Sequence, residues 1–136
     1  MYTGSNPVFH TMIIMEVFMA NKLESDVQAK MIRTIRKYGG YVYKNAQSMY
    51  TEKGRPDLTA CVPVTVKKIV ELFGENAKVG LFVGIEVKRN KKVYDSSDAQ
   101  IIVGKQIQKA SGLWFSIDDP DIVEALMLKF TGDEEN

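Results

Sequence analysis

Residues 79–88 read VGLFVGIEVK, and this stretch decides the fold. It is nearly continuous in apolar residues, which is typical of a strand buried on both faces, so we expect a central strand here. Period-two alternation places Glu86 and Lys88 on one face of that strand, opposite Ile85 and Val87. A carboxylate and an ammonium group at the end of a buried strand must both be desolvated, so packing alone rarely selects them. The stretch therefore predicts a functional site as well as a core.

Helix and strand signals on both sides of this stretch give an α/β fold class. Ser96 or Ser97 is expected to cap a helix running to about Ala110 and ending at Gly112. Asp118-Asp119-Pro120 begins a last helix that extends to about Lys129. The remaining predicted elements are helices over 22–38 and 64–73 and strands over 41–44, 57–62 and 113–117. The order α-β-β-α-β-α-β-α predicts a small mixed β-sheet flanked by helices.

Length and composition predict one domain without cross-links. The chain has 136 residues, which is enough for a single core. Its single cysteine, Cys61, excludes an intrachain disulfide and a zinc site that needs two cysteines. The single histidine, His10, lies near the start of the chain, which disfavours catalysis by a histidine base. Carboxylates, lysines and hydroxyls are left as the groups able to do chemistry.

The domain boundaries follow from the two ends of the chain. Met19-Ala20-Asn21 resembles a second start, so residues 1–20 are expected to be an N-terminal arm that is either upstream sequence or dispensable. The domain itself is predicted to span 21–130, followed by an acidic tail over 131–136. The apolar run 8–20 is too short for a membrane span and lacks the positive region of a signal peptide. With a reduced cysteine, these features predict a cytoplasmic protein.

Charge is distributed unevenly along the chain. Between residues 30 and 110 there are 16 lysines and arginines against 7 acids, whereas residues 118–136 hold 7 acids and one lysine. A basic body with an acidic tail favours a polyanion-binding surface. Lysines that merely solvate helix faces explain the charge alone equally well.

Two further acidic residues fall at positions where chemistry is plausible. Gly54-Arg55-Pro56-Asp57 places a carboxylate at the mouth of a strand after a rigid turn. On a helical wheel, Glu24 projects near the middle of the apolar half of the first helix, where a carboxylate is costly to bury unless it is paired or meets a metal. Asp57 and Glu86 together offer the oxygen ligands that Mg²⁺ takes.

These residues resemble a known family. Pro56-Asp57 followed by Glu86-x-Lys88 is similar to the PD-(D/E)XK signature of the restriction-endonuclease-like nucleases. Adding Glu24 on the first helix and Gln100 a dozen residues after the lysine narrows the resemblance to the VRR-NUC domain, over about residues 23–126. Only a serine matches the Ser/Thr and Pro that the family often has before its glutamine. Gln106 and Gln108 compete with Gln100, which the distance to Gly112 favours.

The resemblance implies a restriction-endonuclease-like core with a metal-dependent site. Its catalytic residues would be Glu24, Asp57, Glu86, Lys88 and Gln100. Mg²⁺ or Mn²⁺ would be held by Asp57, Glu86 and the carbonyl of Val87, with Glu24 completing the shell. The basic residues expected to contact DNA phosphates are Arg55, Arg89, Lys91 and Lys92.

Each of these residues also has a purely structural explanation. Glu24 fits a solvated acid in the first helical turn, and Asp57 fits a turn-former. Glu86 and Lys88 fit an ion pair on a sheet edge, and Gln100 fits a surface helix residue. Their joint occurrence in this order favours the functional interpretation.

The predicted function is a Mg²⁺-dependent, structure-specific DNA endonuclease. Standalone members of this size resemble phage or prophage enzymes that work in the bacterial cytoplasm. The family is associated with homodimers that process branched DNA such as Holliday junctions, and a two-fold dimer suits symmetric cleavage. The alternatives are a less selective or flap-type nuclease and, from another class, a non-catalytic DNA-binding module.

Overall fold

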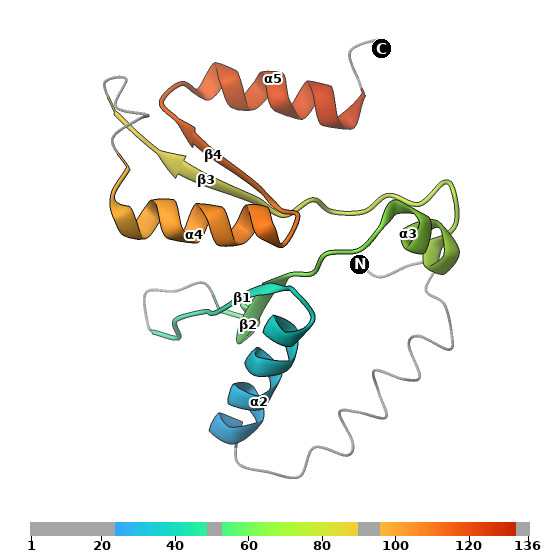
Figure 1. Ribbon diagram of the computed structural model, residues 1–136. Coiled ribbons are helices and arrows are strands. Elements are labelled where there is room, and N and C mark those ends of the chain that lie inside the picture. The colour runs from blue at the N-terminus through green and yellow to red at the C-terminus, as the bar shows by residue number, and fades with distance from the viewer. Residues whose placement is uncertain (1–23, 49–52, 90–95, 133–136) are drawn as a thin grey trace. The chain divides into compact units, whose positions relative to one another are not determined.

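The computed structural model describes residues 24–48, 53–89 and 96–132. The chain divides into two compact units, Met1–Gly80 and Leu81–Asn136, here called the N-terminal and the C-terminal unit. Each unit holds two helices and a two-stranded sheet among its described residues. The order of elements along the chain is α-β-β-α-β-α-β-α, as predicted (Figure 1).

The N-terminal unit begins with helix α2 (Glu24–Lys37). Acids lie in its first turn and bases in its last turn, which matches the helix dipole at both ends. The helix ends ahead of Gly39, whose φ of 86° reverses the chain into β1 (Tyr41–Lys44). Strand β1 pairs antiparallel with β2 (Leu58–Cys61), with Tyr41 opposite Cys61 and Lys44 opposite Leu58. The buried side chains of this sheet are Val42 and Cys61.

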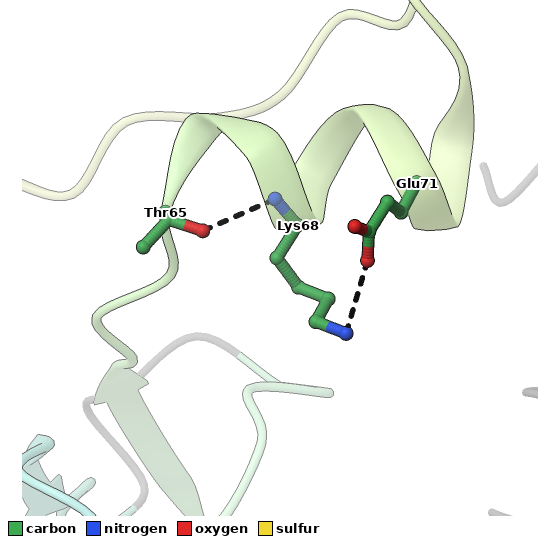
Figure 2. A network of polar contacts seen from close by, with 3 residues as sticks. All are labelled: Thr65, Lys68 and Glu71. Atoms are coloured by element: carbon green, nitrogen blue, oxygen red, sulfur yellow. Dashed lines mark hydrogen bonds and ion pairs between the residues drawn. The ribbon is translucent and has the colours of Figure 1, made fainter.

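Helix α3 (Val66–Phe73) completes the N-terminal unit. The Thr65 hydroxyl caps it by accepting a hydrogen bond from the Lys68 backbone N–H at 3.1 Å (Figure 2). Lys68 also forms an ion pair with Glu71 at 3.1 Å, but both side chains are more than half exposed, so the pair adds little stability. The cap therefore sets where this helix begins.

The C-terminal unit is a β-α-β unit followed by a helix. Strand β3 (Val83–Val87) pairs parallel with β4 (Leu113–Ile117), and helix α4 (Asp98–Lys109) forms the crossover between them. Helix α5 (Pro120–Thr131) follows, with Asp119 as its cap and Pro120 in its first turn. Helices α4 and α5 lie on opposite sides of the strand pair (Figure 1).

The packing of α4 on the strands depends on a glycine. A Cβ atom added at Gly104 would overlap the ring of Trp114 on β4, so the absence of a side chain lets helix and indole approach closely. Ile107 and Ala110 of the same helix are buried, as is Ile117 on β4. Helix α4 thereby covers the face of β3 that carries Gly84, whose Cα lies against Ile107.

The structure differs from the prediction in the sheet and in the bounds of the strand predicted over 79–88. The sequence predicts one mixed sheet with 79–88 as a central strand, whereas the described residues form two two-stranded sheets. Because β4 begins after Gly112 and ends at Ile117, its residues pair with 83–87, and 79–82 lie outside the strand. Val87 is 77% exposed, which is unlike a central strand. The bounds predicted for β1 and β4 are confirmed.

The predicted terminal segments fall largely outside the described residues. The arm over 1–20 is not described, and α5 extends to Thr131, with Gly132 as a left-handed cap at φ 69°. Within the described ranges, no helix is both long enough and apolar enough to span a bilayer.

Candidate functional site

Glu86 and Lys88 both face α4 from the C-terminal end of β3. The Lys88 backbone N–H donates to the Ile117 carbonyl at 2.9 Å, so the ladder and its alternation continue one residue past the strand. Both side chains are half-buried. The predicted pairing of these two residues on one strand face is thus present in the structure.

Gln100, in the first turn of α4, joins these two side chains. Its Nε2 donates to Oε1 of Glu86 at 2.5 Å, and its Oε1 accepts from Nζ of Lys88 at 2.9 Å. We call these three residues the Glu86–Gln100–Lys88 group. Of the three glutamines of α4 considered from the sequence, Gln100 is the one that makes both contacts.

The start of α4 fixes the orientation of the Gln100 amide. Ser97 and Gln100 form a capping box, in which the Ser97 hydroxyl accepts from the Gln100 N–H at 3.2 Å and Gln100 Oε1 accepts from the Ser97 N–H at 2.9 Å. Oε1 therefore uses both lone pairs on donors, and Nε2 faces a carboxylate that only accepts. A flipped amide would bring donor to donor at Lys88 and Ser97 and acceptor to acceptor at Glu86, so one orientation is favoured.

A hollow of about 340 Å³ adjoins this group between β3 and α4. Glu86 and Gln100 line it together with apolar surface from Gly84, Ile107 and Trp114. A concave, largely apolar surface with few polar groups is typical of a binding site. Two members of the Glu86–Gln100–Lys88 group, Glu86 and Gln100, thus border this hollow.

Asp57 and Arg55 lie in the N-terminal unit, in the turn before β2. Both are exposed, and Gly54 opens the turn with a φ of 85°. The Asp57 carbonyl accepts from the Asn45 N–H at 2.9 Å, which anchors the turn to the end of β1. Sequence and structure agree that this carboxylate stands at the mouth of a strand, one residue ahead of Leu58.

Glu24 is exposed, contrary to the burial that the helical wheel predicts. It is the first residue of α2, and its Oε1 accepts a long contact of 3.5 Å from the Gln28 amide. The wheel assumes that the apolar face of the helix is covered, whereas no residue of α2 is buried and even Met31, in the middle of the helix, is 47% exposed. In the N-terminal unit, Glu24 has the environment of a solvated first-turn acid.

The oxygen donors suit a hard divalent cation in kind but are divided between the units. Glu86 belongs to the C-terminal unit, as does Val87, whereas Asp57 and Glu24 belong to the N-terminal unit. Among the residues that the structure describes, no three His, Cys, Asp or Glu side chains form a cluster suited to a metal. Mg²⁺ is commonly bound by only one or two carboxylates together with water and substrate phosphate, so a single carboxylate such as Glu86 fits part of such a shell.

The predicted DNA-contacting residues are described only in part. Arg55 and Arg89 are exposed, one in each unit. Lys91 and Lys92 lie outside the described residues, as does the rest of the segment 90–95.

The sequence analysis did not identify Asn45, and it identified Ser97 only as a possible helix cap. Asn45 lies between the predicted strands over 41–44 and 57–62, yet it is buried, and its side chain contacts Arg55, Pro56 and Thr59. No local signal marks it, because its partners lie 10 to 14 residues away. Ser97 had a usable signal, since Ser followed three residues later by Gln is the capping-box pattern.

Comparison with known proteins yields no match among protein-family models, curated proteins or solved structures. The resemblance to the VRR-NUC domain therefore rests on the residues quoted above and stays a prediction.

Proposed function

We propose that this chain is a metal-dependent nuclease that cleaves DNA. The observation that carries the proposal is the Glu86–Gln100–Lys88 group, in which one amide fixes a carboxylate and an ammonium group beside a hollow. A carboxylate that can bind a cation and a lysine that can contact a phosphate are groups that suit metal-dependent phosphodiester hydrolysis. The excess of basic residues between 30 and 110 supports a polyanionic substrate.

The residues of the group have separate roles in this proposal. Glu86 would hold Mg²⁺ or Mn²⁺ through a carboxylate oxygen, with the Val87 carbonyl beside it, and the resemblance adds Asp57 and Glu24 as ligands. When bound, the cation supplies Lewis acidity at the scissile phosphate. Lys88 stabilises the negative charge that develops on that phosphate and positions the attacking water. Gln100 orients Lys88 toward both, because its carbonyl oxygen accepts from the ammonium group.

The finer parts of the proposal come from the resemblance. They are a restriction-endonuclease-like core, a branched DNA substrate such as a Holliday junction, a homodimer and a cytoplasmic location in bacteria. A flap-type or less selective nuclease would share the same chemistry and differ only in the DNA structure that it prefers.

Cleavage of a synthetic four-way junction tests the proposal, with duplex and flap substrates alongside. We expect products in Mg²⁺ and none in EDTA, and mapped cleavage sites identify the preferred structure. Lys88→Ala should lower the rate by orders of magnitude while DNA binding changes little, since one contact is a small part of a multi-phosphate footprint. Lys105→Ala, an exposed lysine of α4, is the matched control.

Two outcomes would contradict the proposal in different ways. A chain that retards DNA in EDTA and never cleaves it in Mg²⁺ is a binding module without catalysis. A binding constant that does not fall between low and physiological salt counts against any nucleic-acid partner, because counterion release makes such binding steeply salt-dependent.

A further inference from the structure

Asn45 is the single buried polar side chain within the ranges that the structure describes. It follows β1 directly and is 8% exposed. Its Nδ2 donates to the Pro56 carbonyl and to the Thr59 hydroxyl, each at 2.8 Å. Its Oδ1 accepts from Nη2 of Arg55 at 2.9 Å. Both ends of the amide are therefore engaged, which is the condition for burying such a group at low cost.

The chemistry of these partners fixes how the amide is turned. A guanidinium group has only donors and a proline carbonyl has only an acceptor, so Oδ1 must face Arg55 and Nδ2 must face Pro56. A rotated amide would lose both contacts. Asn45 consequently imposes one arrangement on the residues that it touches.

Those residues flank Asp57 in the chain. Asn45 contacts the residues at positions 55 and 56 before it and Thr59 after it, and its own backbone N–H donates to the Asp57 carbonyl. The Asp57 side chain itself is exposed, so these bonds hold the turn that carries the carboxylate while solvent reaches the carboxylate itself. The same amide holds the Arg55 guanidinium beside this turn.

We infer that Asn45 is a positioning residue, which fixes the Asp57 carboxylate for a divalent cation and the Arg55 guanidinium for a phosphate of the substrate. This inference rests on the proposed nuclease function. It differs from a structural role because an amide that only stabilised the fold would affect the stability of the protein and not its requirement for metal.

The test measures how much Mg²⁺ the full chain needs. Initial rates of four-way-junction cleavage are recorded against Mg²⁺ concentration for the natural chain, Asn45→Ala and Val42→Ala, well below the lowest melting temperature. Val42 is buried in β1, the strand that Asn45 follows, so its truncation is the control for lost stability. We expect Asn45→Ala to raise the half-saturating Mg²⁺ concentration about tenfold, as loss of groups that support metal ligands does, with Val42→Ala unchanged.

Mn²⁺ binding without DNA gives an independent readout. Electron paramagnetic resonance of unbound Mn²⁺ should show the same weakening in Asn45→Ala. If that variant does not fold, Thr59→Val removes one partner of the amide in a nearly isosteric change and should shift the Mg²⁺ requirement less, in the same direction.

The outcomes separate this inference from the proposed function. Equal Mg²⁺ requirements in Asn45→Ala and the natural chain, or an equal shift in Val42→Ala, overturn the inference and leave the nuclease function in place. A natural chain that neither cleaves the junction nor binds Mn²⁺ overturns the proposed function itself.

Discussion

In the C-terminal unit, hydrogen bonds join the polar side chains directly to one another. In the N-terminal unit, hydrogen bonds hold the turn that carries the candidate metal ligand Asp57. In the former, Gln100 bonds directly to the functional groups of Glu86 and Lys88. In the latter, Asn45 bonds to residues around Asp57 and leaves the carboxylate exposed. In the first arrangement, the positions of the polar groups depend on one side chain. In the second, the position of the carboxylate depends on several contacts within a turn. Single substitutions should therefore have larger effects on activity in the C-terminal unit.

The sharpest test of this difference is Gln100→Ala. It removes the link between Glu86 and Lys88, and we expect the cleavage rate to fall about a hundredfold, at the upper end for residues that orient catalytic groups. The variant also loses half of the capping box, which costs about 0.5–1 kcal/mol of stability. Gln106→Ala, exposed on the same helix, is the control for both quantities. Rates of junction cleavage near those of the natural chain would show that the amide does not position Lys88.

A second substitution tests the packing that places α4 over β3. In Gly104→Ala the new methyl group overlaps the Trp114 ring, so helix and strand must separate. Overpacking costs about 1–3 kcal/mol and exceeds the roughly 1 kcal/mol that alanine gains over glycine in a helix. We expect a net loss of about 1 kcal/mol in urea unfolding. A more stable Gly104→Ala protein would mean that the indole moves aside without cost.

Local sequence signals predicted some elements and site residues correctly, but contacts between distant residues could not be predicted. Caps and terminators predicted α4 and β4 because those signals are local, and alternation correctly paired Glu86 with Lys88. The length of β3 depends on its neighbour β4, which alternation does not reveal. The predicted burial of Glu24 was wrong because a wheel does not show whether a helix face is covered, and no residue of α2 is buried. Three of the five predicted site residues are brought together, and the other two lie in the N-terminal unit.

Cys61 gives a way to follow the N-terminal unit separately, since it is the chain's single cysteine and is buried on β2. Burial raises the pKa of its thiol. The pKa of the Tyr41 hydroxyl is also raised, mainly by burial and to a lesser extent by the neighbouring Tyr43. We expect Cys61 to react with a disulfide reagent at least about tenfold more slowly in the folded chain than in urea, because the thiolate is the reactive form.

The same shifts determine the dependence of stability on pH. Both groups are neutral when protonated and hold their protons more tightly in the folded chain. Their contribution is complete below the unfolded pKa values and is lost as the pH rises through the folded ones. Urea midpoints should therefore fall under alkaline conditions, and less so in Cys61→Ala. A midpoint that stays constant as alkali is added would contradict the burial of these groups.

The smallest expected effect belongs to Glu24→Gln. An exposed first-turn acid interacts weakly with the helix dipole, so its neutralisation should cost roughly 0.3 kcal/mol. If Glu24 also binds the cation, the variant should lose part of the thermal stabilisation by Mg²⁺ and cleave more slowly. Melting curves with and without Mg²⁺, run beside the cleavage assay, distinguish these cases. An unchanged Mg²⁺ shift and full activity would remove Glu24 from the site.

The contact between Gly104 and Trp114 also provides a spectroscopic probe. Trp114 is the single tryptophan of the chain, and its ring lies against α4 in the C-terminal unit. Selectively excited indole emission therefore reports solvent entry at that helix–strand contact. Far-ultraviolet circular dichroism follows the helices of both units at once. If the emission and the dichroism change at different urea concentrations, the two units unfold as separate cooperative bodies.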